Sequence, residues 1–150
     1  MKLVALIGAI ILAVAGTGLQ SSDAAPPAKP SIAFSANPVS IGAAYAVTGS
    51  DFIPGRAVVI QAWTGDGTFN CETVVNPAGS FTCNFVAVES FGVATLGGGS
   101  IRDHGAYGGK GYITWGDNES PHLAFQSVLP CNGPSPCWER VDYKNLTVLP

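Results

Sequence analysis

Charge is scarce in this chain. Of its 150 residues only 11% are charged, and 10 acidic against 7 basic residues leave a formal net charge of −3. The basic residues form no cluster or stripe, although grouped lysines and arginines are what phosphate binding requires. Nucleic acid is therefore excluded as a predicted partner. Long apolar runs are also missing after the N-terminal segment, where short runs alternate with glycines and prolines, a pattern that favours strands over helices.

Motifs that carry catalysis are missing as well. No Gly-x-Ser-x-Gly nucleophile elbow occurs after the N-terminal segment, and Gly109-Lys110 lacks the remaining residues of a phosphate-binding loop. A zinc site is a weak alternative, because there is no Cys-x-x-Cys and neither His104 nor His122 stands at ligand spacing from a cysteine. We therefore predict a protein that is not an enzyme and holds neither a metal nor a cofactor.

Two short polar groups offer competing chemistry. Asp103-His104 has the composition of an oriented base, but no nucleophile is placed near it, so two solvated loop residues are the favoured interpretation. Asp117, Asn118 and Glu119 are rich in oxygen, but they lack the spacing of a calcium-binding loop. A polar turn is the favoured interpretation there.

Residues 1–25 have the pattern of a secretory signal helix. Lys2 supplies a positive start, Leu3–Ala15 is apolar but short for a membrane span, and small residues follow up to Ala24 and Ala25. We expect cleavage near Ala24 or Ala25, with a site near Ala15 and retention as an anchor left open. The mature protein is predicted to be secreted or extracellular, or attached to the cell surface, and to meet a membrane only through this segment if it is not cleaved.

Export gives the four cysteines a structural meaning. An oxidising compartment favours disulfides, and four cysteines allow three connectivities. We favour the two local pairs, Cys71 with Cys83 and Cys131 with Cys137, because a hairpin and a tight proline-rich loop are expected to bring each pair together.

The rest of the chain indicates one all-β domain. Residues 26–30 form a proline-rich leader, and residues 31–150 are predicted to form an antiparallel β-sandwich. The expected strands cover residues 31–36, 45–48, 57–63, 70–75, 80–86, 112–115, 123–129 and 143–149, with a further strand within 86–96. Residues 97–111 are expected to form a long glycine-rich connection.

The segment 70–86 is the best specified element. Asn76-Pro77-Ala78-Gly79 is typical of a type I turn with a left-handed glycine, and we expect a hairpin around it. Alternation places Cys71 and Thr73 on the same face as Phe81, Cys83 and Phe85, which is consistent with the 71–83 disulfide.

The stretch YAVTGSDFIPG supports a family resemblance. Gly49 is expected to break the strand, Phe52 to plug the core and Pro54-Gly55 to turn the chain. This Gly-x-x-Phe-x-Pro-Gly spacing, together with the ending Leu146–Pro150, resembles bacterial immunoglobulin-like domains. The resemblance implies an immunoglobulin-like fold and says little about function.

The first functional hypothesis is a binding or adhesion module that recognises a glycan, an envelope component or a protein. Long loops on a rigid sandwich are usual places for binding surfaces, here residues 97–111 and 116–122. Aromatic side chains there are candidate contacts, whereas Trp63 is expected in the core. The candidates are Tyr107, Tyr112, Trp115 and Trp138.

Two alternatives remain. The size, acidity, opening strands and two short-range cysteine pairs also resemble the neocarzinostatin-type apoproteins, although the first pair comes later in the chain than in that family. That resemblance implies a carrier that holds an apolar small molecule in a cleft. The other alternative is a structural subunit in which the leader or an edge strand pairs with a neighbouring chain.

Overall fold

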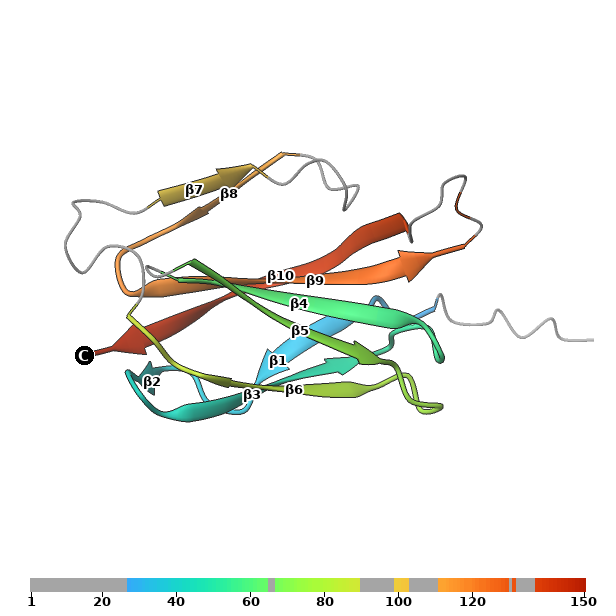
Figure 1. Cartoon of the computed structure of the whole chain (residues 1–150), viewed down its shortest axis with the longest axis horizontal. Helices are drawn as coiled ribbons and strands as arrows, with labels where there is room; N and C mark the ends of the chain where they lie inside the picture. The colour runs from blue at the N-terminus through green and yellow to red at the C-terminus, as the bar shows by residue number, and fades with distance from the viewer. Residues whose placement is uncertain (1–26, 65–66, 90–98, 103–110, 130, 132–136) are drawn as a thin grey trace, which may run out of the picture.

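The computed structural model describes residues 27–64, 67–89, 99–102, 111–129, 131 and 137–150 (Figure 1). The regular structure within these ranges is entirely β, so the predicted all-β class is confirmed. In chain order the strands are β1 (Ser31–Phe34), β2 (Val39–Ser40), β3 (Ala44–Ser50), β4 (Ala57–Thr64), β5 (Gly67–Val74), β6 (Phe81–Val86), β7 (Gly99–Arg102), β8 (Tyr112–Trp115), β9 (Glu119–Val128) and β10 (Cys137–Leu149).

Two sheets face each other as a sandwich. One has the strand order β1-β3-β6, and the other has the order β2-β10-β9-β4-β5. The apolar faces of both sheets meet in a core cluster that excludes water, which is the main stabilising contribution to such a fold. Its buried members include Ile32, Val47, Phe52, Val58, Ile60, Phe81, Cys83, Ala124, Leu146 and Val148.

The sandwich is closed on one side and open on the other. On the closed side β1 lies against β10, and the Ile32 amide donates a hydrogen bond to Asp142 Oδ2 at 2.8 Å. On the open side β5 ends one sheet and β6 ends the other, and the two strands share no sheet ladder. The open side is therefore bounded by two edge strands.

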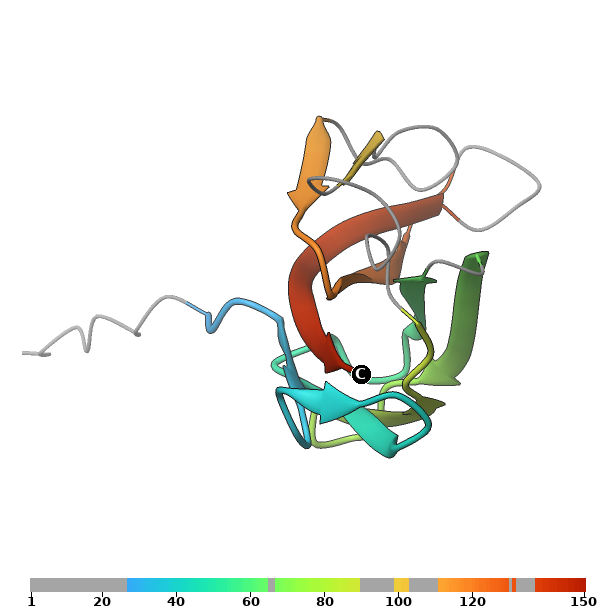
Figure 2. The same cartoon turned by 90° about the vertical axis from the view of Figure 1, so that its left-hand side faces the viewer.

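A third layer covers the outer face of the larger sheet. β7 and β8 pair as a small antiparallel ribbon, drawn at the top of Figure 1 and, from the side, at the top of Figure 2. Alternation along β9 sends His122 and Ala124 into the sandwich and sends Leu123 and Phe125 outward, under this ribbon. The outward residues form a second core cluster of Ile101, Ile113, Trp115, Leu123 and Phe125, with Trp63 and Trp138 packed against it. β4 and β9 are buried at successive residues for this reason.

The predicted corner after β3 is largely confirmed. Phe52 is buried in the core, and Gly55 has a φ of 76° and donates its amide to the Val75 carbonyl. The expected strand break at Gly49 is wrong, because Gly49 continues β3 and pairs with both neighbouring strands. Glycine is needed there for space, since a Cβ atom would overlap the ring of Phe81.

The predicted hairpin over residues 70–86 is wrong in its pairing. The turn itself forms, with Gly79 at a φ of 78° and the Asn76 amide bonded to the Ser80 carbonyl. Beyond the turn the strands separate, because β5 pairs with β4 and β6 pairs with β3. The two apolar faces meet across the sandwich rather than side by side in one sheet.

Several strand limits also differ from the prediction. β7 occupies part of the expected glycine-rich connection, where Ile101 pairs with Ile113. β9 and β10 begin earlier than expected, and a bulge between Arg140 and Asp142 reverses which face each side chain of β10 takes. Most of the expected strand within 86–96 lies outside the described residues.

Both predicted disulfides are present, Cys71–Cys83 and Cys131–Cys137. Disulfides persist in oxidising compartments, so the pair of them supports a secreted protein. Residues 1–25 lie outside the described ranges, and the signal peptide stays a prediction. No helix in the described part of the chain has the length and apolarity needed to cross a membrane.

Candidate functional site

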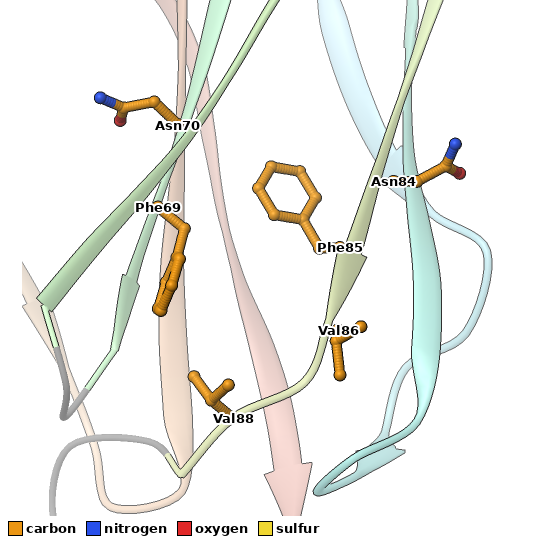
Figure 3. A pocket seen from close by; sticks show the side chains of 6 residues that line it. All are labelled: Phe69, Asn70, Asn84, Phe85, Val86 and Val88. Carbon is orange, nitrogen blue, oxygen red and sulfur yellow. The ribbon is translucent and has the colours of Figure 1, made fainter.

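A cleft opens between the two edge strands on the open side of the sandwich. The Cys71–Cys83 disulfide ties β5 to β6 with a Cα–Cα distance of 6.0 Å. Two residues farther from the turn, at Phe69 and Phe85, the strands leave a cavity of about 300 Å³. Figure 3 shows the Phe85 ring and Val88 directed into this gap. The lining residues are Phe69, Asn70, Asn84, Phe85, Val86 and Val88.

The lining is apolar yet accessible. Phe69 is 45% exposed although it lies in a regular strand, and Val86, on the outward face of β6 at the rim, is 58% exposed. Alternation places Phe69 on the inward side of β5 with Cys71 and Thr73, where a side chain is normally covered by the opposite sheet. The divergence of β5 and β6 leaves it uncovered.

Phe85 joins the cleft to a cluster of four rings that lies behind it. Phe85 stacks on Tyr45, with centroids 5.7 Å apart and planes 19° apart. His122 lies edge-on to Tyr45, Phe85 and Phe34, at centroid distances of 5.6, 5.7 and 4.9 Å. We call Phe34, Tyr45, Phe85 and His122 the ring cluster. It draws residues from β1, β3, β6 and β9, so both sheets contribute to it.

Two hydrogen bonds fix the protonation state of His122. Its Nδ1 lies 2.9 Å from the Ser120 carbonyl, which can only accept, so Nδ1 carries the proton. Nε2 then accepts a 2.6 Å hydrogen bond from the Tyr45 hydroxyl. Burial lowers the pKa of His122 to about 4, and the Ser120 hydrogen bond offsets part of that effect. Burial also raises the pKa of Tyr45 above its usual range. Both side chains are therefore neutral near pH 7.

The cleft is suited to a small neutral ligand. None of its six lining residues is charged, and Figure 3 shows the amides of Asn70 and Asn84 directed away from the gap, so the side chains that face it are apolar. Mainly apolar walls are typical of small-molecule sites, and 300 Å³ lies at the lower end of their usual size. A charged ligand would gain no ion pair from these walls.

The residues predicted from the sequence as binding contacts do not gather at this cleft. Tyr107 lies outside the described residues. Tyr112 is 69% exposed on β8, with the Arg102 guanidinium 5.7 Å from its ring centroid. Trp115 is only 8% exposed and belongs to the second core cluster, and the half-buried Trp138 packs against the same cluster. The structure thus gives Trp115 a packing role, and the binding role of the four residues stays a prediction.

Among the other polar candidates, Glu119 has a structural role. The carboxylate of Glu119 accepts hydrogen bonds from the Gly116 amide at 2.6 Å and from Asn145 Nδ2 at 3.2 Å, so it fastens the turn before β9. Asp103 and His104 lie outside the described residues. The described part of the chain contains no group of three or more potential metal-binding His, Cys, Asp or Glu residues.

One cleft residue, Phe69, could have been recognised in the sequence, but it lay outside the predicted strands. Phe69 has the same parity as Cys71, so an aromatic residue follows the disulfide at the next inward position. The predicted strand started at Asn70, which left Phe69 in a loop. His122 carried no signal of its own, because a single histidine without ligand spacing is indistinguishable from a surface residue in a sequence.

Comparisons with known proteins leave the family open. No model of a protein family matches the chain, and no curated protein matches it. A solved structure, macromomycin, is similar at a TM-score of 0.44 and 15% sequence identity, over 80% of this chain and 99% of that one. These results give the predicted bacterial immunoglobulin-like family no specific support.

Proposed function

We propose that this protein is a secreted, non-enzymatic carrier that holds a small, neutral and largely apolar molecule in the cleft between β5 and β6. The observation that supports this most directly is the exposure of Phe69, an inward-facing side chain, across the gap from Phe85. Exposed apolar side chains that gather in a concave site gain free energy when a ligand covers them.

The scaffold around the cleft supports the same proposal. Cys71–Cys83 limits how far β5 and β6 separate, and the ring cluster packs behind the cleft with residues from both sheets. A preorganised site loses less conformational entropy when the ligand binds, so binding is tighter. This arrangement fits the small-molecule carrier, which was one of the alternatives predicted from the sequence. The adhesion module has less support, because Trp115, one of its predicted contacts, is packed into a core cluster.

Binding of the neutral fluorescent dye Nile red tests the proposal. Phe69→Ala removes an exposed ring from the cleft wall, and we expect it to weaken dye binding by about tenfold, the equivalent of about 1.4 kcal/mol. Val74→Ala is the matched control, because Val74 is 61% exposed on the opposite face of the same strand and does not line the cleft.

Two results would contradict the proposal. Equal dye affinities in the Phe69→Ala and Val74→Ala variants would remove the cleft as the binding site. Native mass spectrometry of protein recovered from its producing cells gives the second test, because a carrier is expected to retain the mass of a small non-covalent ligand. Absence of that mass together with absence of dye binding would refute the carrier function.

A further inference from the structure

The ring cluster connects the cleft to a titratable group that solvent cannot reach. Phe85 lines the cleft and stacks on Tyr45, and its ring lies nearly perpendicular to that of His122, with the centroids 5.7 Å apart. His122 has an exposed fraction of 0%. A ligand resting on Phe85 therefore lies one ring away from the His122–Tyr45 pair.

Protonation of His122 reverses its hydrogen bond with Tyr45 and places a charge in the core. An added proton must go to Nε2, because Nδ1 already carries one for the Ser120 carbonyl. Nε2 would then donate to the Tyr45 oxygen, and the Tyr45 hydroxyl would have to turn its own proton away from its present acceptor, 2.6 Å away. The buried imidazolium also lacks solvation, which costs free energy unless the packing opens.

The elements around His122 offer little to stabilise that charge. Its ring lies nearly perpendicular to those of Phe34 from β1, Tyr45 from β3 and Phe85 from β6. Across the ladders its partners are Ala62 on β4 and Lys144 on β10, and Lys144 is itself cationic and exposed. The titratable or charged groups in these positions are thus a neutral phenol and an ammonium, and neither favours a second positive charge.

We propose that the His122–Tyr45 pair makes the cleft acid-sensitive, so that the ligand is held near neutral pH and released on acidification through displacement of Tyr45 and Phe85. This inference rests on the carrier function proposed above and adds its regulation. Burial, which lowers the pKa of His122 to about 4, places the release well below neutral pH.

Nile red binding measured from pH 7 to about pH 3 tests the inference. We expect the dissociation constant of the wild-type protein to stay constant down to about pH 5 and to rise by about tenfold one unit below the pKa of His122. Tyr45→Phe keeps the imidazole, so its acid release persists. The double variant Tyr45→Phe/His122→Leu has no titratable group in the ring cluster, and its affinity is expected to be independent of pH over the same range.

A second measurement uses the unaltered protein and does not depend on how the double variant folds. The pKa of His122, followed by NMR, is expected to fall further when Nile red is bound, because a proton that weakens ligand binding is itself bound less tightly in the complex. An identical pKa with and without dye would overturn the inference. So would a wild-type affinity that does not change with pH while near-ultraviolet circular dichroism reports a folded protein. Absence of dye binding at every pH would instead refute the carrier function itself.

Discussion

The Cys71–Cys83 disulfide at the cleft is expected to contribute more to stability than the Cys131–Cys137 disulfide at the start of β10. Cys71 and Cys83 are 12 residues apart, and Cys131 and Cys137 are 6 apart. By the chain-entropy model, loops of these lengths correspond to about 3 and about 2 kcal/mol of stabilisation. The first disulfide also joins the two sheets through the buried Cys83, whereas Cys137 is exposed. Its loss therefore removes packing in addition to the chain constraint.

Urea unfolding followed by tryptophan fluorescence measures the difference. We expect Cys71→Ala/Cys83→Ala to lower the free energy of unfolding by about 3 kcal/mol or more, and Cys131→Ala/Cys137→Ala to lower it by about 2 kcal/mol. The first variant alone is also expected to bind Nile red more weakly, because its edge strands are free to separate. Equal losses of stability together with equal dye affinities would refute the idea that this disulfide sets the width of the cleft.

Two further predictions concern the core. Gly49→Ala is expected to destabilise the protein by about 1 to 3 kcal/mol in the same urea assay, because its Cβ overlaps the Phe81 ring; an unchanged midpoint would show that the ring has room to move. Acid is expected to destabilise the ligand-free protein between about pH 6.5 and pH 4, because unfolded His122 takes up a proton at its ordinary pKa while the folded pKa is about 4. The shift corresponds to about 3 kcal/mol, present in full above this window and lost as the pH falls through it. A urea midpoint that falls equally in the Tyr45→Phe/His122→Leu variant would exclude His122 as the cause.

The strands whose residues alternate between apolar and polar were the ones that could be predicted from the sequence. β3 and β6 each bury every second residue over most of their length, because one face lies on the core and the other in water. β4 and β9 were harder to delimit, since they are buried on both faces and their sequences lose the period of two. Gly99–Arg102 carried no strand pattern at all, and its pairing partner β8 lies beyond the segment 103–110.

The local sequence pattern could not predict which strands pair with each other. Cys71, Phe81 and Cys83 do share an apolar environment, as their parity predicted. Parity cannot distinguish two strands that lie side by side in one sheet from two strands that face each other across a core. The cleft depends on that distinction, because two paired strands would have left no gap at Phe69 and Phe85.

The cover that β7 and β8 give to the outer face of the larger sheet has a consequence for motion. β4 and β9 lie between two layers of side chains, whereas β5 and β6 each have one neighbouring strand and a face in water. Amide hydrogens of β4 and β9 are therefore expected to exchange with solvent only through global unfolding, and those on the unpaired side of β5 and β6 through small local openings. Amide exchange is thus expected to be slow at the centre of the larger sheet and faster along the two edge strands that border the cleft.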